Sequence, residues 1–241
     1  MIKKILKLIG VIALLVITGL LVYGFIIHES LPKGKSGVEA DELAKKMLKA
    51  LNYNAYQNTC YLEWSFRNGS VRYKWDKDLG ECQVKWDDYI VALNLGTVEK
   101  SKVTKNNNDP SPKEYEKALE KAIGLFNNDS FWLVAPFKIF DKGATKKLIK
   151  LEDGSEALLV TYTKGGNTPG DSYLWLLNPN GFPNAYKMWV SIIPIGGIEA
   201  SWDDWLVTES GAFLPKSHEF GPMTLSMGNV RGYNKNPEGL E

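Results

Sequence analysis

The alternation of apolar and polar residues between Leu62 and Leu95 is the feature that most constrains how this chain can fold. Large apolar residues occupy every second position of four short segments, and turn residues separate these segments. A period of two places successive side chains on opposite faces of a strand, so each segment predicts a strand with one buried face. Asn68-Gly69, between the first two segments, is a strong signal for a two-residue hairpin. The pattern therefore predicts a four-stranded antiparallel meander.

The predicted hairpins also fix which residues of neighbouring strands lie opposite each other. Pairing across the first turn places Leu62 opposite Trp75, and pairing across the second turn places Trp75 opposite Cys82. Cys60 and Cys82 then lie on the first and third strands, about 9.6 Å apart, beyond the limit of roughly 7 Å for a disulfide. We therefore expect two buried free thiols, even in an oxidising compartment.

An apolar segment without a charged residue runs from Leu8 to Ile27. A helix of this length spans about 30 Å, which matches the hydrocarbon core of a bilayer. Three lysines within the first seven residues precede the segment and favour a cytoplasmic amino terminus. The alternative is a cleaved signal peptide, which has a shorter apolar core and a small-x-small cleavage site that residues 24–30 lack. We expect an uncleaved signal anchor with an extracytoplasmic domain, at a bacterial inner membrane facing the periplasm.

The chain divides into three parts on this interpretation. Residues 1–30 are a cytoplasmic basic tip and a transmembrane anchor, residues 31–36 are a short tether, and residues 37–241 are the extracytoplasmic domain. Eight tryptophans and eleven tyrosines argue against disorder, because aromatic residues supply the burial that offsets chain entropy. After residue 35 the chain holds 24 basic and 27 acidic residues, so we expect no nucleic-acid partner.

Two helices and a second series of strands complete the predicted domain. A capping box precedes each of two segments with helical spacing, and these segments predict helices over residues 37–52 and 112–126. Residues 100–112 are polar and mostly loop. From about residue 145 onward strands dominate again, one of them over residues 198–207. The fold class is mainly β (α+β), with about eleven antiparallel strands and two helices after one N-terminal transmembrane helix, which fits one sandwich or barrel.

The order of these elements resembles the LolA/LolB-type fold of bacterial lipoprotein-carrier proteins. The segment from Asn128 to Lys138, after the second helix, also resembles segments of membrane-anchored bacterial proteins of this superfamily. The resemblance covers about residues 37–230. It implies a half-barrel, an incomplete barrel whose strands wrap helices that line or plug an apolar cavity, and it implies binding of an apolar ligand.

Large aromatic residues crowd the face of the sheet that this fold would turn inward. They pack as ordinary core in one interpretation. In the other, a curved sheet that two short helices cannot fill leaves an apolar cavity, and the anchor places this cavity near membrane lipid. The candidate lining residues are Leu62, Trp64, Trp75, Trp86, Trp132 and Trp175.

The sequence carries none of the common catalytic or metal-binding motifs. It has no Gly-x-Ser-x-Gly elbow, phosphate loop, dinucleotide fingerprint or His-Glu-x-x-His pair. His28 lies at the end of the apolar segment and is interpreted as an interfacial anchor. His218 lies between charged neighbours and is expected to be a solvated surface residue. We expect no cofactor and no metal ion.

Two further segments contain acidic residues that could carry chemistry. In Lys164–Asp171, three glycines could let backbone amides approach an anion, and Asp171 could act as a base. The alternative, which we favour, is a tight connection between two strands. In Trp202–Trp205, adjacent aspartates on a strand would point to opposite faces, so a solvated strand end is expected rather than a shared proton or metal.

The leading hypothesis is a non-catalytic, membrane-anchored extracytoplasmic protein that binds a lipid or a lipidated partner in an apolar cavity. One alternative is a structural or partner-binding module with a solid core. Another is a hydrolase or transferase that uses the loop Gly165–Asp171. The sequence leaves the ligand and any protein partner unidentified.

Overall fold

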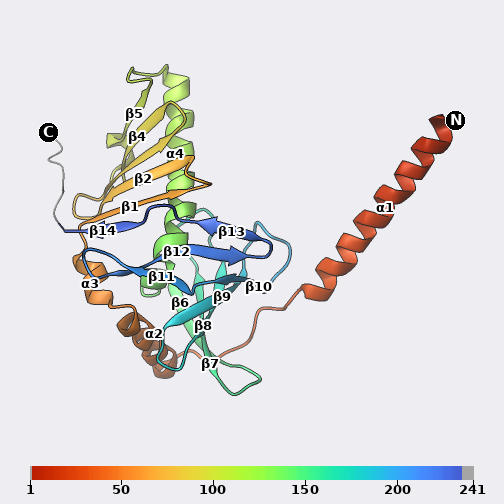
Figure 1. Ribbon diagram of the computed structural model, residues 1–241. Coiled ribbons are helices and arrows are strands. Elements are labelled where there is room, and N and C mark those ends of the chain that lie inside the picture. Colours follow the sequence, from red (N-terminus) through yellow and green to blue (C-terminus); the bar gives the residue numbers. More distant parts are fainter. Residues whose placement is uncertain (1, 235–241) are drawn as a thin grey trace.

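The computed structural model describes residues 2–234 and shows two antiparallel sheets with an N-terminal helix that projects from them (Figure 1). This helix, α1 (Ile2–Ile27), includes the segment Ile9–Ile27, which is long and apolar enough to cross a membrane. None of that segment is buried inside the rest of the protein. The core of the domain is therefore formed without α1.

The first sheet contains the predicted meander. Its strands are β1 (Tyr61–Phe66), β2 (Val71–Asp76), β3 (Glu81–Trp86), β4 (Tyr89–Asn94), β5 (Lys102–Lys105) and β14 (Arg231–Tyr233), in the order β14-β1-β2-β3-β4-β5. The predicted register is confirmed, with Leu62 opposite Trp75 and Trp75 opposite Cys82. Both cysteines are free thiols, as expected. Cys82 is buried, whereas Cys60 is only half-buried, because it lies just before β1.

The second sheet follows in the chain and is larger. Its strands are β6 (Ala144–Lys150), β7 (Glu156–Tyr162), β8 (Ser172–Leu177), β9 (Pro183–Trp189), β10 (Ile198–Ser201), β11 (Asp204–Val207) and β12 (Phe213–Phe220), in the order β11-β12-β10-β9-β8-β7-β6, and β13 (Met223–Ser226) pairs with β12. Within residues 2–234 neither sheet closes on itself. The structure is thus mainly antiparallel β with a few helices, and it has more strands than the eleven we expected.

Two of the additional strands arise where the sequence pattern was misread. β5 lies in the stretch that we expected to be loop, and it follows a short 3₁₀ helix, η1 (Val98–Lys100). The single strand expected over residues 198–207 is two strands, β10 and β11, with Trp202 between them. Trp202 is fully buried, and its backbone N–H donates to the Asn184 carbonyl at 2.6 Å. The strand is interrupted at Trp202 and Asp203, so the aspartates of Trp202–Trp205 do not lie on one continuous strand.

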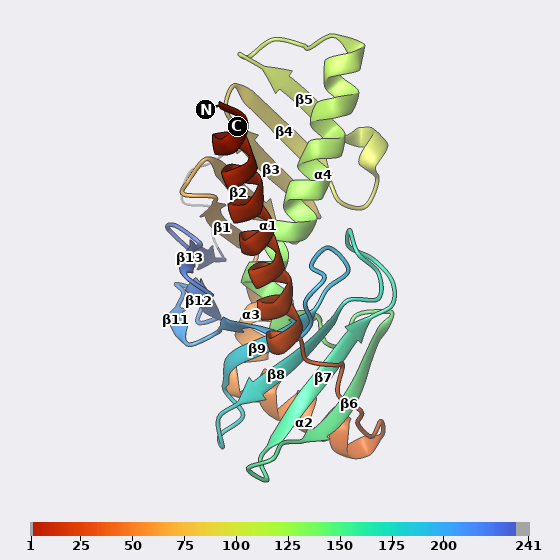
Figure 2. The ribbon, with the colours of Figure 1, turned by 90° about the vertical axis from the view of Figure 1, so that its right-hand side faces the viewer.

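Three helices besides α1 pack on the sheets (Figures 1 and 2). These are α2 (Val38–Ala50), α3 (Tyr53–Asn58) and α4 (Pro112–Val134), and a 3₁₀ turn, η2 (Ala135–Lys138), follows α4. α2 packs on β6 and β7, whereas α4 contacts β4 and β5 of the first sheet and β12 of the second. α4 is about two turns longer than the predicted helix over 112–126, and its added turns reach the second sheet.

The extension of α4 crosses residues that we expected to end the helix. Asn127, Asn128, Asp129 and Ser130 are poor helix formers. In the structure the Asp129 side chain is buried, and its carboxylate accepts hydrogen bonds from the Tyr73 hydroxyl and the Asn128 amide. These tertiary contacts with the first sheet outweigh the weak local preference, so the helix continues.

The end of α1 is fixed against the connection between β9 and β10, residues 190–197. The Gly196 N–H donates to Nδ1 of His28 at 3.0 Å, and Nε1 of Trp189 donates to the Glu29 carbonyl at 2.7 Å. A side chain at Gly196 would overlap the Trp189 ring, since an added Cβ would lie 2.3 Å from Cδ1. The following tether is also held, because Lys35 pairs with Leu148 of β6. α1 therefore joins the domain at a defined place.

Candidate ligand cavity

A cavity of about 720 Å³ lies between the two sheets and beside α4. Trp75 and Leu95 contribute to its wall from the first sheet and its β4 end. α4 contributes Phe126 and the residues of its last two turns. The second sheet and its connections contribute the remaining apolar wall, namely Tyr162, Tyr173, Tyr186, Met188, Val190, Ile192, Ile193 and Phe220. The extension of α4 that the sequence did not predict therefore forms much of this cavity.

The rim of the cavity is mostly polar, whereas its deeper wall is apolar and aromatic. The exposed rim residues are Asp141, Lys142, Lys164, Gly165, Gly166 and Asn167. By contrast, Tyr173, Tyr186, Met188 and Val190 are each less than a tenth exposed. Lys138 forms an ion pair with Asp141 at 2.8 Å, which neutralises one charge of each sign at the rim. An apolar wall with a few polar groups at its edge is typical of sites for small apolar or amphipathic ligands.

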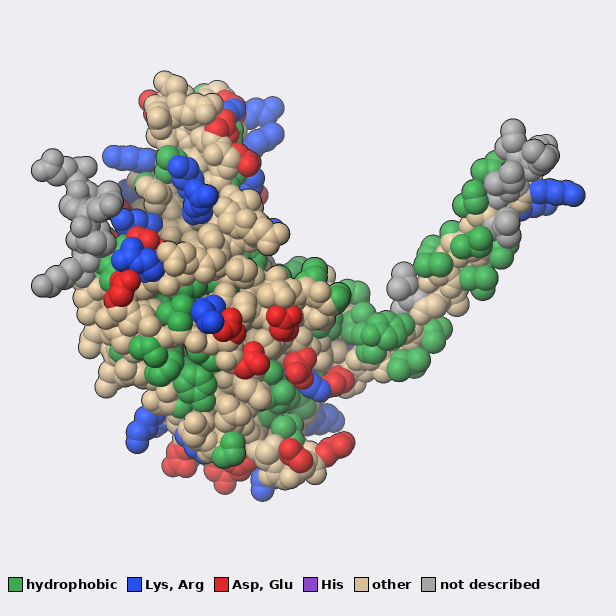
Figure 3. Space-filling view, viewed as in Figure 1, with side chains coloured by type: hydrophobic (Ala, Val, Ile, Leu, Met, Phe, Trp, Pro, Cys, Tyr) green, Lys and Arg blue, Asp and Glu red, His purple; other side chains and the backbone are tan. Residues whose placement is uncertain are grey.

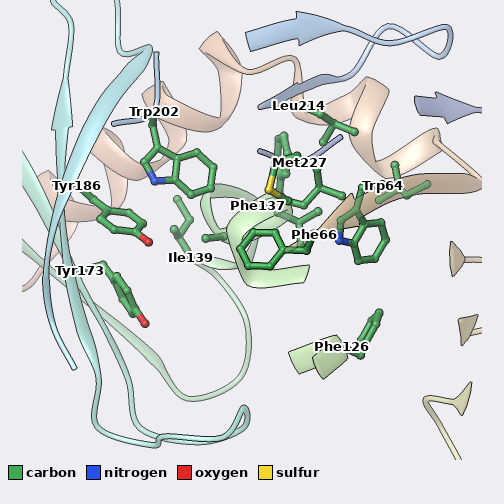
Figure 4. Close-up of a cluster of buried hydrophobic side chains, with 14 of the residues drawn as sticks. Trp64, Phe66, Phe126, Phe137, Ile139, Tyr173, Tyr186, Trp202, Leu214 and Met227 are labelled. Atoms are coloured by element: carbon green, nitrogen blue, oxygen red, sulfur yellow. The ribbon is translucent and has the colours of Figure 1, made fainter. Parts of the chain in front are cut away.

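Two of the six candidate lining residues, Trp75 and Trp132, line this cavity. The other four, Leu62, Trp64, Trp86 and Trp175, do not line it and are at most 4% exposed in the packed core. Figure 4 shows part of this core, with Trp64 and Phe126 on one side and Tyr186 and Trp202 on the other. Trp64 stacks on Tyr73 and packs near Phe126 of α4. Trp175 of the second sheet packs against Tyr186 and Trp202, so these side chains face protein rather than open space.

Several wall residues were missed because only the first sheet was given a register from the sequence. Tyr162, Tyr173 and Tyr186 lie on β7, β8 and β9, and their rings are near neighbours, with centroids 5.9 and 5.1 Å apart. Pairing these strands in the same way as the meander would have brought the three tyrosines to one face. Phe131 could not be found that way, because the helix was expected to end before it.

The loop Lys164–Asp171 closes one side of the cavity. Asn127 of α4 donates from Nδ2 to Oδ1 of Asn167 at 3.0 Å, and Asn167 donates in turn to the Gly124 carbonyl at 3.1 Å. Gly165 and Gly166 have φ values of 79° and 65°, which non-glycine residues rarely adopt. The glycines therefore serve a turn that connects β7 to β8 and docks on α4, a contact that the sequence analysis did not include.

Asp171, the possible base of this loop, is buried and already engaged. One carboxylate oxygen accepts from the Ser191 N–H at 2.9 Å, and the other accepts from the Thr168 hydroxyl. Both oxygens thus hold the loop and the β9–β10 connection in place. Within residues 2–234 no cluster of three or more His, Cys, Asp or Glu residues could hold a metal ion.

The phenols of the deeper wall are neutral hydrogen-bond donors. Burial raises the pKa of Tyr173, and the nearby Asp171 carboxylate adds to the effect. Burial also raises the pKa of Tyr186 well above its ordinary value. Neither phenol ionises near neutral pH, so each can donate its hydroxyl hydrogen to an acceptor.

His218 is a buried residue, and our expectation of a solvated surface histidine is wrong. Its Nδ1 lies 2.7 Å from the Ser201 carbonyl oxygen, and its Nε2 lies 2.8 Å from the carbonyl oxygen of Trp132 on α4. β12 packs against α4, so the imidazole ring of His218 lies between the backbone carbonyls of Ser201 and Trp132. Burial lowers the pKa of His218, and the two carbonyls oppose this effect.

We expect the stability of the protein to fall as the pH is lowered below the ordinary histidine pKa of about 6.5. His218 has a lowered pKa in the folded state, so the unfolded chain binds its proton first. A single proton gives a slope of at most about 1.4 kcal/mol per pH unit. Urea unfolding between pH 7.5 and 5 should show this loss, and His218→Gln should reduce it. An equal slope in the two proteins would contradict the assignment.

No protein-family model and no curated protein matches this chain. What the site can bind therefore follows from its geometry. The cavity can enclose an apolar body of moderate size and offers neutral donors on its deeper wall. Asp171, the acidic residue of the loop Lys164–Asp171, is held by hydrogen bonds within the protein.

Proposed function

We propose that this protein is a membrane-anchored, extracytoplasmic protein that binds a lipid or a lipidated partner without covalent chemistry. The observation that carries the proposal is the cavity of about 720 Å³ with its apolar, aromatic inner wall. Ligand sites typically have volumes of about 300–1,000 Å³. Burial of apolar ligand surface contributes about 25 cal/mol per Å², so an acyl chain is a suitable occupant.

The place where α1 joins the domain supports the membrane as the source of this ligand. Ile192 and Ile193 of the β9–β10 connection line the cavity, and Ile192 is 73% exposed. The same connection holds the end of α1 through Gly196, and Gly24 of α1 lies against Ile195. Figure 3 shows hydrophobic side chains along α1 and on the adjoining part of the body. On this proposal, a lipid that leaves the bilayer beside α1 meets the rim of the cavity first.

The sequence supports the remaining parts of the proposal. The lysines before the apolar segment favour an amino terminus in the cytoplasm and a domain on the opposite side. The resemblance to the LolA/LolB-type carriers belongs to the same proposal, since apolar-ligand binding is what it implies. A hydrolase is less favoured because Asp171 is engaged within the protein. A module with a solid core is less favoured because of the cavity.

Photolabelling from a bilayer tests the proposal. The full chain is reconstituted in phosphatidylcholine vesicles that contain a phosphatidylcholine with a diazirine near the end of one acyl chain. We expect labelled peptides from the last turns of α4 and from β8 and β9, in addition to α1. Labelling restricted to α1 would contradict the proposal, because it would mean that acyl chains contact the anchor alone.

A further inference from the structure

Three tyrosines from neighbouring strands form a row on the wall of the cavity. Tyr162 of β7, Tyr173 of β8 and Tyr186 of β9 all line it. The ring of Tyr173 lies between the other two, at 5.9 Å from Tyr162 and 5.1 Å from Tyr186. The register explains the arrangement, since Tyr173 lies opposite Val160 and Met188. Tyr162 is two residues after Val160, and Tyr186 is two residues before Met188. Side chains two residues apart on a strand share one face.

The hydroxyls of this row differ in their partners. The Tyr162 hydroxyl donates to the Ala135 carbonyl at 3.3 Å. The Tyr186 hydroxyl is fully buried and has no hydrogen-bond partner among residues 2–234. The indole N–H of Trp202 approaches it, but that group is a donor and leaves the phenol hydrogen without an acceptor. A buried donor without an acceptor destabilises the protein.

Tyr173 is the member of the row that is best placed to meet a ligand. Its side chain is 9% exposed and lines the cavity, and burial, with the Asp171 carboxylate adding to the effect, raises the pKa of its hydroxyl. Within the described part of the chain, no acceptor is bonded to this hydroxyl. Figure 4 shows the hydroxyls of Tyr173 and Tyr186 pointing away from the sheet in the same direction. The second sheet therefore presents phenol donors to the cavity among apolar wall residues such as Met188 and Val190.

The charge near Tyr173 indicates which acceptor suits it. Asp171 and Tyr173 line the same cavity, and after burial the Asp171 carboxylate is the second cause that raises the pKa of the Tyr173 phenol. By the same Coulomb interaction, a ligand carboxylate or phosphate at this position would be repelled. Rim cations such as Lys142 and Lys164 are exposed rather than on the deeper wall. An uncharged carbonyl oxygen accepts the phenol hydrogen without this penalty.

We propose that the cavity selects acyl esters or acyl amides, whose uncharged carbonyl oxygen accepts a hydrogen bond from the Tyr173 hydroxyl while the acyl chain fills the apolar wall. This inference rests on the proposed function and adds the chemical class of the ligand. On this proposal the cavity prefers an acylated lipid to an alkane or an isoprenoid hydrocarbon. These hydrocarbons fill the same space but leave the phenol hydrogen of Tyr173 unbonded.

Two photoactivatable probes test this selectivity on the full chain in phosphatidylcholine vesicles. One is a sixteen-carbon acyl methyl ester with a diazirine in the chain, and the other is an alkane of equal length with the diazirine at the same place. Labelling of cavity peptides is divided by labelling of α1 in the same sample, which corrects for probe concentration in the bilayer. In the wild type we expect this ratio to be about 3–10 times higher for the ester, the value of one hydrogen bond.

Tyr173→Phe should bring the ester ratio down to that of the alkane, whose own ratio should be unchanged. The matched control is Tyr115→Phe, which removes a hydroxyl that donates to the Ser101 carbonyl away from the cavity wall and should keep the preference for the ester. An ester preference that survives in Tyr173→Phe, or none in the wild type, would overturn the selectivity while leaving the cavity function intact. If neither probe labels the cavity, the proposed function itself fails, and the selectivity fails with it.

Discussion

Phe131→Glu is expected to abolish lipid retention in the cavity while the protein remains folded. The Phe131 ring lies on the cavity wall, with its centroid 4.8 Å from that of Tyr173 and 5.4 Å from that of Tyr162. The residue is only half-buried, so a glutamate there can reach water when the cavity is empty. A bound acyl chain would bury the carboxylate without a partner, which costs several kcal/mol. We therefore expect lipid labelling of the cavity to fall at least about tenfold.

Phe140→Glu is the matched control for this variant. Phe140 follows η2, is 44% exposed and lies outside the cavity wall. The same chemical change at this position should leave cavity labelling within about twofold of the wild type, since no apolar ligand is buried against it. Equal labelling of the two variants would argue against an acyl chain beside Phe131.

Asp129→Ala is expected to be the most destabilising of these substitutions. The Asp129 side chain is fully buried, accepts from the Tyr73 hydroxyl and the Asn128 amide, and lies 3.5 Å from the Arg67 guanidinium. Its removal leaves the buried Tyr73 hydroxyl without an acceptor and removes the contact that favours the last turns of α4. We expect a loss of about 3 kcal/mol. The midpoint of thermal unfolding should fall by about 6–12 °C.

A surface aspartate provides the comparison. Asp141 pairs with Lys138, and both side chains are close to half exposed. Exposed ion pairs contribute roughly 0–1 kcal/mol, so Asp141→Ala should shift the midpoint by only about 0–4 °C. A small effect of Asp129→Ala, comparable to that of Asp141→Ala, would show that the buried network does not stabilise α4.

The meander was predictable because the signals that define it lie within each strand and in the turn between neighbouring strands. Alternation defined the strands, and Asn68-Gly69 fixed the register, so that Leu62 and Trp75 lie opposite each other as expected. The length of α4 was not predictable in this way. Its last turns contain residues with weak helix preference, and the contact that holds them, Asp129 with Tyr73, joins residues far apart in the chain.

The composition of the candidate site was only partly predictable for the same reason. Alternation indicates which residues face the interior, but it does not separate a residue packed against protein from one beside a cavity. Trp64 and Trp75 lie on the same face, yet only Trp75 lines the cavity, because Trp64 is stacked on Tyr73. His218 was expected at the surface because its neighbours in the sequence are charged, but it is buried. The alternation of β12, in which Glu219 is exposed, agrees with a buried His218.

Native mass spectrometry of the full chain tests whether a lipid occupies the cavity. The protein is purified in detergent, and collisional activation is raised until the lipid and detergent around α1 are removed. We expect one acyl lipid per chain to remain bound after this step, because the two sheets and α4 surround it. A bare protein at every activation energy that removes the annular lipid, with the fold intact, would show that the cavity does not hold a lipid.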